Sequence, residues 1–172
     1  MAETFNPDSR TVVNGPTSTN RPAEYQQTLR RLDALLEGET DWVAAMATVA
    51  SELHHAFDHF HWTGFYRAVA DGALIIGPYQ GTHGCLRIPG GRGACGAAAS
   101  TKKTQRIADV STFEGHIACS ATTRSEIVVP IVNADGMLLG VLDVDSDYPD
   151  AFDQTDQHFL EKFCDDLGRR FG

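Results

Sequence analysis

The cysteines of this chain and the segments around them carry its most reactive chemistry. Cys119 lies among glycine, small and polar residues just before a β-branched run, residues 127–132, that predicts a strand. A thiol attacks as the thiolate, which needs exposure and a favourable local field, whereas a core cysteine is small, apolar and inert. Cys85 and Cys95 also lie in glycine-rich loop sequence, so three loop cysteines could converge on one site. Cys164 differs, because its amphipathic C-terminal segment predicts a buried, structural thiol.

Carboxylates lie on the strand that is expected to follow residues 127–132. Asp143 and Asp145 alternate along it, so both side chains point to one face, about 7 Å apart. Burial and mutual repulsion would raise the pKa of one carboxyl and leave an acid that can donate a proton near neutral pH. The alternative is a solvated strand end that leads into a turn. Glu126, at the start of the neighbouring strand, could join the pair.

Two aromatic residues share one face of an earlier predicted strand. Trp62 and Tyr66 are four residues apart, and this spacing puts both rings on the same side of a strand. Aromatic residues on a hairpin are often core residues, and they also form pocket walls. The sequence leaves both interpretations open.

Three ligand-binding patterns are present only in part. Residues 91–96 match a dinucleotide fingerprint, but no clear strand precedes them and the βαβ unit is absent. The four histidines of residues 54–61 lack the glutamate of a zinc-protease helix, so a solvated histidine patch is expected there. A zinc site made of His116 and the three loop cysteines would have wide spacings and no C-x-x-C pair. We therefore expect no bound metal or prosthetic cofactor.

Composition limits the class of protein and of ligand. The 172 residues, 42% of them hydrophobic, suffice for one domain with a substantial core. A net charge of −9 without a basic stripe argues against nucleic acids and anionic membrane surfaces, so a small molecule is the favoured ligand. The sequence shows no signal-like start, and its apolar runs are too short to span a bilayer. Four cysteines suit a reducing compartment, so we expect a cytoplasmic protein.

The order of predicted elements indicates an α+β fold. Residues 1–19 are polar and rich in turn formers, which predicts a flexible N-terminal leader before a single domain, residues 20–172. The domain is expected to start with two helices, capped by Asn20 and by Thr40 or Asp41, and to end with a helix capped by Asp153. An antiparallel sheet lies between them, with long loops that close a small-molecule pocket on one side.

The predicted sheet consists of two hairpins and a short strand. The first hairpin starts at Trp62, turns at residues 70–72 and ends at a break formed by residues 77–78. A long loop, a short helix over residues 93–100 and a short strand over residues 105–110 follow. The loop with Cys119 then leads to the second hairpin, which turns at the Asp-Gly of residues 135–136.

A combined pattern of glycine-rich, cysteine-containing and strand segments covers the chain from about Trp62 to the C-terminal helix: residues 77–81, 85–89, 91–96, 115–119, 124–130 and 140–146. This pattern closely resembles the free methionine-(R)-sulfoxide reductases, which are GAF-domain enzymes. It is specific, because ordinary GAF sensor domains lack the three ordered cysteines. The resemblance implies reduction of free methionine-(R)-sulfoxide by a GAF-like domain.

The resemblance also implies roles for the cysteines. Cys119 matches the catalytic cysteine, Cys85 its resolving partner and Cys95 an auxiliary thiol. Attack by Cys119 would leave a sulfenic acid that condenses with a nearby thiol to a disulfide, which a thioredoxin-type dithiol then reduces. Residues 81–92 are the candidate lid whose motion carries Cys85 toward Cys119. Ser120 departs from the family pattern, which has Asp after the catalytic cysteine.

The remaining matches concern the substrate and the assembly. Glu126, Asp143 and Asp145 match the carboxylates that bind the substrate amine and assist departure of the oxygen. Trp62 and Tyr66 match the aromatic walls that hold its methyl group, and the resemblance favours a homodimer. Two alternatives remain: a GAF-type small-molecule sensor, and a redox switch that has no small substrate.

Overall fold

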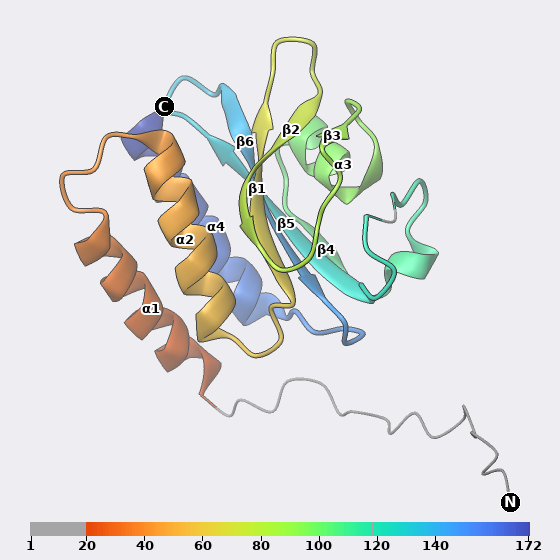
Figure 1. Cartoon of the computed structure of the whole chain (residues 1–172), viewed down its shortest axis with the longest axis horizontal. Helices are drawn as coiled ribbons and strands as arrows, with labels where there is room; N and C mark the ends of the chain where they lie inside the picture. The colour runs from red at the N-terminus through yellow and green to blue at the C-terminus, as the bar shows by residue number, and fades with distance from the viewer. Residues whose placement is uncertain (1–19, 118) are drawn as a thin grey trace, which may run out of the picture.

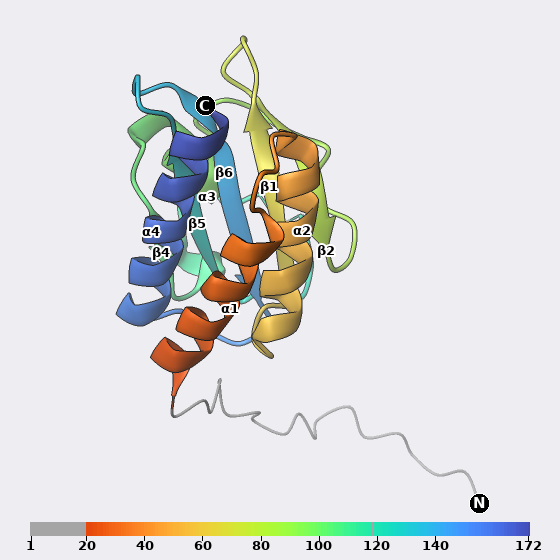
Figure 2. The ribbon, with the colours of Figure 1, turned by 90° about the vertical axis from the view of Figure 1, so that its left-hand side faces the viewer.

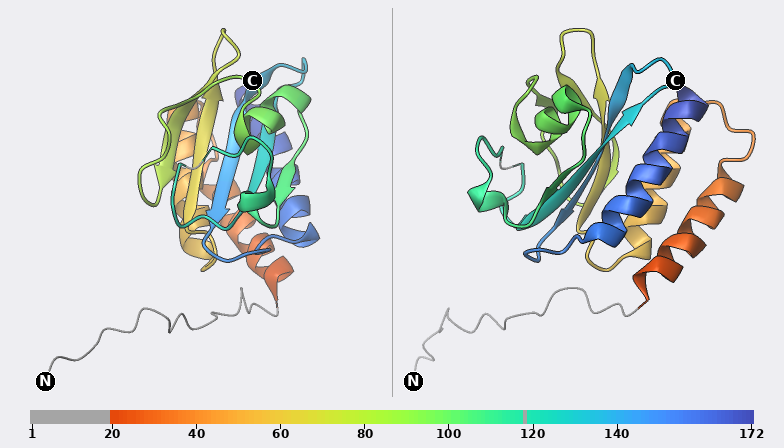
Figure 3. Two further views of the ribbon diagram at one scale, coloured as in Figure 1. Left: turned by 90° about the vertical axis from the view of Figure 1, so that its right-hand side faces the viewer. Right: turned by 180° about the vertical axis from the view of Figure 1, so that it is seen from behind.

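A six-stranded antiparallel sheet separates two layers of the molecule (Figure 1). The structure, a computed structural model, describes residues 20–117 and 119–172, so the predicted leader, residues 1–19, lies outside the described residues. Helices α1, α2 and α4 cover one face of the sheet (Figure 2), and α3 with the connecting loops covers the other (Figure 3). This arrangement confirms the predicted α+β class.

The helices are α1 (Arg21–Leu35), α2 (Trp42–Ala56), α3 (Gly93–Thr101) and α4 (Gln154–Phe171), with a short 3-10 helix at Val110–Thr112. The strands are β1 (Trp62–Ala68), β2 (Leu74–Gln80), β3 (Arg87–Ile88), β4 (Gln105–Ile107), β5 (Ser125–Val132) and β6 (Leu138–Ser146). Their order across the sheet is β3-β2-β1-β6-β5-β4, so β6 lies between the two hairpins.

Local sequence signals determine where the long helices begin. Pro22 lies in the first turn of α1, where its missing N–H breaks no helical hydrogen bond. Asp41 caps α2 by accepting a hydrogen bond from the backbone N–H of Ala44 at 2.8 Å. Asp153 caps α4 in a capping box with Asp156. The predicted caps Asp41 and Asp153 are therefore confirmed.

Alternation along the central strands divides their side chains between two cores. Ile127 and Val129 on β5 join the core under α1, α2 and α4, whereas Val128 joins a second core under α3. On β6, Leu142 likewise joins the helix-side core and Val141 joins the core under α3. The predicted structural thiol of α4, Cys164, is 0% exposed in the helix-side core, as expected.

Two of the predicted strand boundaries are wrong. Strand β2 does not end at Gly77 but continues through Pro78 to Gln80. The pairing of β1 with β2 is irregular between Gly64 and Tyr66, and at such a bulge a proline without an N–H is tolerated. The strand expected over residues 105–110 ends at Ile107.

Local contacts also explain two further differences from the predicted loops. After β4, the Asp109 side chain accepts a hydrogen bond from the backbone N–H of Ser111 at 2.9 Å and starts the 3-10 turn. The long loop that follows β2 contains β3, which pairs with Leu74 and Ile75 of β2. A two-residue strand leaves no periodicity that a sequence pattern could reveal.

The expected solvated histidine patch is wrong at His59. This side chain is only 4% exposed and packs among the rings of Phe57, Phe60 and Phe152. Its Nε2 atom lies 3.7 Å from Oδ1 of Asp156, at the start of α4. The segment after α2 turns into the core, which a pattern of polar residues does not indicate.

None of the described helices combines the length and the hydrophobicity needed to cross a membrane.

Candidate active site

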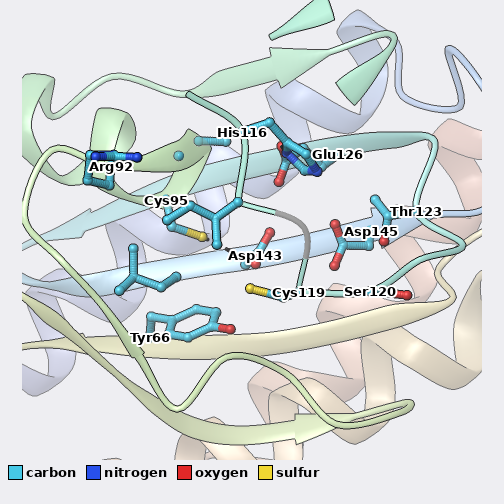
Figure 4. Close-up of a pocket in the computed structure, with 14 residues that line it drawn as sticks. Tyr66, Arg92, Cys95, His116, Cys119, Ser120, Thr123, Glu126, Asp143 and Asp145 are labelled. Carbon is cyan, nitrogen blue, oxygen red and sulfur yellow. Dashed lines mark hydrogen bonds and ion pairs between the residues drawn. The ribbon is translucent and has the colours of Figure 1, made fainter. Parts of the chain in front are cut away.

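The register of β6 with its two neighbours brings the predicted carboxylates together. Asp145 lies opposite Glu126 of β5 on one side and opposite Trp62 of β1 on the other. Asp143, two residues earlier, points to the same face as Asp145 and lies opposite Gly64 of β1. One oxygen from each carboxylate lies within 4.8 Å of the others (Figure 4). The predicted pair and its third member therefore form one cluster on the α3 side of the sheet.

Gly64 provides the room beside this cluster. A Cβ atom there would lie 2.4 Å from Cβ of Tyr79 and 2.6 Å from the Trp62 ring, closer than atoms can pack. The Trp62 ring stacks on Tyr66 at 5.9 Å and on Tyr79 at 5.3 Å, and its Nε1–H donates to the backbone oxygen of Thr82 at 2.9 Å. The aromatic packing around Trp62 therefore requires glycine at this position.

The two predicted aromatic residues differ in their place at the site. Tyr66 lines the cavity above the carboxylates, at 2% exposed. Trp62 is also buried but packs behind Tyr66 and is not among the residues that line the cavity in this disulfide-bonded form. In this stacked pair, Tyr66 is therefore a wall of the pocket and Trp62 is a core residue. Burial, followed by the charge of Asp143, raises the pKa of the Tyr66 hydroxyl, which stays protonated.

Burial sets the protonation of the carboxylates. Desolvation, followed by repulsion from Asp145, raises the pKa of Glu126 to about 8. Desolvation and repulsion from Asp147 raise the pKa of Asp145 to about 7. The pKa of Asp143 is also well above its usual value, because Asp143 is buried and faces both other carboxylates. The cluster therefore holds protons near neutral pH, as a general acid must.

Two of the three predicted cysteines are bonded to each other. Cys85, from the segment between β2 and β3, forms a disulfide with Cys119, and their Cα atoms are 5.3 Å apart. Cys119 lines the same cavity as the carboxylates. Cys95 lies in the first turn of α3, is 5% exposed and donates a hydrogen bond from Sγ to Oδ2 of Asp143 at 3.2 Å. All three loop cysteines therefore meet at one place.

The cavity between these groups is small. It has a volume of about 30 Å³, room for one or two water molecules, so an amino acid does not fit while the disulfide is present. Its walls come from β1, β5, β6, α3 and the two long loops (Figure 4); the polar lining includes Arg92, His116, Ser120, Thr123 and the three carboxylates. Ser120, the predicted departure from the family pattern, lines the cavity with its Oγ 3.1 Å from Oγ1 of Thr122.

No sequence pattern assigned the histidine and the arginine of this lining to the carboxylate site. Nδ1 of His116 lies 3.6 Å from Oε1 of Glu126. Burial lowers the pKa of His116 and raises that of Glu126, so near pH 7 this contact joins two mainly neutral groups. Arg92 is the N-cap residue of α3 and brings a positive charge to the opposite end of the cavity. The only sequence signal for either residue was its place beside a glycine in a cysteine-containing segment.

The arrangement can bind a cation or donate a proton. Among the described residues, Glu126, Asp143 and Asp145 form a group close enough to share one metal ion, but their raised pKa values mean that any cation has to compete with protons near neutral pH. Oε1 of Glu126 and Oδ1 of Asp143 are buried and have no hydrogen-bond partner within the described structure. A ligand with hydrogen-bond donors would satisfy both atoms.

Comparison with known proteins identifies the family. The GAF domain family matches residues 24–171. Protein YtsP of Bacillus subtilis is 45% identical over 151 residues, which cover 87% of this chain and 92% of YtsP. The free methionine-R-sulfoxide reductase of Saccharomyces cerevisiae is 42% identical over 158 residues, 88% of each protein.

A solved structure agrees with these relatives. The free methionine-R-sulfoxide reductase of Neisseria meningitidis in complex with its substrate has a TM-score of 0.85 and 40% sequence identity, and the match covers 94% of this chain and 96% of that one. Both the sequence and the fold therefore match over nearly the whole described length. The chain belongs to the free methionine-R-sulfoxide reductase family of GAF-domain proteins.

Proposed function

We propose that this chain reduces free L-methionine-(R)-sulfoxide to L-methionine, with Cys119 as the attacking thiol. The observation that carries the proposal is the position of Cys119, which is bonded to Cys85 and lines one cavity with Glu126, Asp143 and Asp145. A thiol that alternates between a disulfide and a free form, next to carboxyls protonated near neutral pH, meets the needs of sulfoxide reduction. The names of the related proteins support the same activity.

The chemistry takes place in four steps. The Cys119 thiolate attacks the sulfoxide sulfur while a carboxylic acid of the cluster protonates the oxygen, so a sulfur–sulfur bond forms and the sulfur–oxygen bond breaks with loss of the oxygen as water. A water molecule then attacks the Cys119 sulfur; the sulfur–sulfur bond breaks, its electron pair stays with the methionine sulfur, a proton returns to the cluster and Cys119 becomes a sulfenic acid. The thiol of Cys85 then condenses with the sulfenic acid, which releases water and forms the disulfide. A thioredoxin-type dithiol reduces this disulfide by exchange and is itself oxidised.

The acidic cluster also accounts for selectivity. A free amino acid carries an ammonium group, which can donate hydrogen bonds to the unpaired buried oxygens of Glu126 and Asp143. A residue within a peptide lacks this group and would leave the carboxylates unpaired, which weakens its binding. Tyr66, backed by Trp62, offers an apolar wall to the methyl group of the substrate.

The size of the cavity supports a moving lid. With Cys85 bonded to Cys119, only about 30 Å³ remains, so the described form corresponds to the enzyme after the product has left. Reduction of the disulfide frees residues 81–92 to move away and admit the next substrate. We propose that disulfide formation expels methionine and that reduction reopens the pocket.

A coupled assay tests the activity. NADPH oxidation with thioredoxin and its reductase is followed with free L-methionine-(R)-sulfoxide, the free (S) epimer and a peptide-bound (R)-sulfoxide in parallel. We expect turnover of the free (R) form alone. Lack of turnover with every substrate, both with thioredoxin and with dithiothreitol, would overturn the proposal and favour a sensor.

A pair of variants separates the reductase from its alternatives. Cys119→Ser is expected to abolish turnover, because a hydroxyl cannot form the sulfenic acid or the disulfide. The control is Cys164→Ala, which removes a buried thiol from α4 in the other core and leaves turnover in place. A sensor would bind its ligand equally well in both variants, and a redox switch would form the disulfide without consuming a sulfoxide.

Assembly is a separate proposal. The expected homodimer can be tested by light scattering during size-exclusion chromatography, which would give about twice the mass of the 18.7 kDa chain. A mass of one chain at working concentrations would contradict it.

A further inference from the structure

The thiol of Cys95 is placed to act on one oxygen of Asp143. Sγ of Cys95 donates to Oδ2 of Asp143 at 3.2 Å, and both side chains are buried, at 5% and 6% exposed (Figure 4). The other oxygen, Oδ1, has no hydrogen-bond partner within the described structure. The thiol thus occupies one oxygen of the carboxylate and leaves the other available to a ligand.

We propose that Cys95 is a positioning residue, whose thiol holds the Asp143 carboxylate in its working orientation by a hydrogen bond and takes no part in disulfide exchange. This inference rests on the proposed function, and it differs from the role of auxiliary redox thiol that the family resemblance implies. Cys95 acts only through Asp143, so it is not itself a catalytic residue.

The environment of Cys95 favours a donor over a nucleophile. Burial, followed by the charges of Asp143 and Glu126, raises the pKa of this thiol, so it stays neutral and keeps the proton that it donates. Its neighbours on α3, Ala94 and Ala98, are buried in the same core, which holds the helix against the sheet. Cys85 instead lies on a connecting segment and is already bonded to Cys119.

The hydrogen bond also affects how the acidic cluster shares its protons. A donor to Asp143 stabilises the ionised form of that carboxylate and so opposes the burial and repulsion that raise its pKa. The titratable groups nearest this carboxylate come from several elements: Glu126 on β5, Asp145 on β6 and Tyr66 on β1, while His116 and Arg92 line the same cavity from the loops. The hydrogen bond from Cys95 therefore keeps the pKa of Asp143 lower than burial and repulsion alone would make it.

Two substitutions at position 95 separate the two roles. Cys95→Ser removes the redox chemistry but keeps a hydroxyl donor, whereas Cys95→Ala removes both. We expect Cys95→Ser to retain most of the wild-type kcat/KM and its pH profile. Cys95→Ala is expected to lose about threefold to tenfold in kcat/KM at neutral pH, because one hydrogen bond to Asp143 is lost. For the same reason, the acidic limb of its pH profile of kcat/KM should shift to higher pH by about half to one unit.

A second pair of variants controls for changes in side-chain size and in folding. Cys95→Thr and Cys95→Val have nearly the same shape and differ in a hydroxyl, so the threonine variant should exceed the valine variant in activity. Cys164→Ala creates a similar small void in the other core and should leave the pH profile unchanged. NMR titration of isotope-labelled carboxyl carbons without substrate gives a readout that needs no turnover, and Asp143 should titrate at higher pH in Cys95→Ala.

The outcomes distinguish this inference from the proposed function. Equal losses in Cys95→Ser and Cys95→Ala, with a Cys95 disulfide trapped during turnover of the wild type, would overturn the positioning role in favour of a redox role. An unchanged titration of Asp143 in Cys95→Ala would overturn it as well. Absence of turnover in the wild type would instead refute the proposed function, and the titration would still test the hydrogen bond.

Discussion

At the scale of single residues, the burial that raises the carboxyl pKa values of the acidic cluster also makes the folded protein less stable at alkaline pH. Glu126 is 6% exposed, lies opposite Asp145 in the strand register and has an oxygen without a hydrogen-bond partner in the described structure. Its pKa of about 8 lies above the usual 4.5, so between these values the folded protein binds more protons than the unfolded chain. The contribution of Glu126 to stability is therefore greatest below about pH 4.5 and is lost as the pH rises through about 8.

Glu126→Gln should stabilise the protein at alkaline pH and inactivate it. Glutamine stays neutral, so the buried charge and its repulsion with Asp145 disappear, and we expect the thermal midpoint at pH 9 to rise by several degrees with little change at pH 5. Each kcal/mol corresponds to about 2–4 °C for a domain of this length. Calorimetry at both pH values measures the effect. Glu114→Gln, at an exposed loop position, is the control, and equal midpoints for Glu126→Gln and the wild type at pH 9 would contradict the prediction.

At the scale of elements, the segment from β2 to α3 connects the disulfide with the aromatic pair. The indole N–H of Trp62 holds the backbone oxygen of Thr82, and Gly84 lies directly over the two rings. Cys85 follows Gly84 in the chain. The packing of this segment against the rings of Trp62 and Tyr66 therefore determines where the Cys85 sulfur lies relative to Cys119. Packing of the lid and formation of the disulfide are therefore coupled.

Gly84→Ala should weaken the Cys85–Cys119 disulfide. A Cβ atom at this position would lie 3.1 Å from the Trp62 ring, 3.1 Å from the Tyr66 hydroxyl and 3.2 Å from Ile76. Overpacking of this kind costs about 1–3 kcal/mol, which corresponds to about fivefold to a hundredfold in the disulfide equilibrium.

The measurement is the disulfide content after equilibration in glutathione redox buffers, quantified by thiol alkylation. Thr82→Ser is the matched control, because the exposed Thr82 makes its lid contact through the backbone oxygen. An equilibrium for Gly84→Ala that equals that of the wild type would show that the segment is not seated on the rings when the disulfide forms.

At the scale of the whole molecule, stability and chemistry lie on opposite faces of the sheet. The helix-side face holds a buried polar junction in which Asp156 accepts hydrogen bonds from Arg21 at 2.5 Å, from Tyr25 at 2.8 Å and from the backbone N–H of Asp153 at 2.8 Å. Burial disfavours the charge of Asp156, but the neighbouring His59 side chain, these hydrogen bonds and the charge of Arg21 outweigh it, so its pKa is lowered. The junction connects α1 with α4, whereas the carboxylates of the cavity lie on the opposite face of the sheet.

Asp156→Asn should destabilise the protein without changing its kinetics. Among the described residues, the substitution leaves the buried Arg21 with only the exposed Asp153 as an ionised partner, which we expect to cost about 3 kcal/mol at pH 7. The difference from the wild type should shrink as the pH falls from 3.8 through the lowered pKa of Asp156, because the carboxylate takes up a proton first in the unfolded chain and only then in the folded wild type. Denaturant unfolding measures the loss, and kcat of the folded variant at 25 °C should match the wild type. A large loss of kcat would show that the two faces are coupled.

Much of this architecture follows from local sequence. The caps at Asp41 and Asp153 and the β-branched run that becomes β5 are local features, because a few neighbouring residues determine them. The limits of β2 and the existence of β3 were not foreseeable in this way. Both depend on a partner strand: Pro78 is tolerated because the pairing with β1 is irregular there, and β3 exists through its contacts with Leu74 and Ile75.

The order of residues alone establishes which chemical groups this protein has, and it predicts Asp143 and Asp145 on one face of a strand, because side chains alternate along a strand. Which partners these groups contact depends on the folded arrangement of the elements. Glu126 lies opposite Asp145, Cys95 donates to Asp143, and Trp62 lies behind Tyr66, although the members of the first two pairs are 19 and 48 residues apart in the chain. Contacts across such distances depend on register and on the packing of separate elements, and the desolvation that raises the carboxyl pKa values exists only once those elements have closed over the cluster.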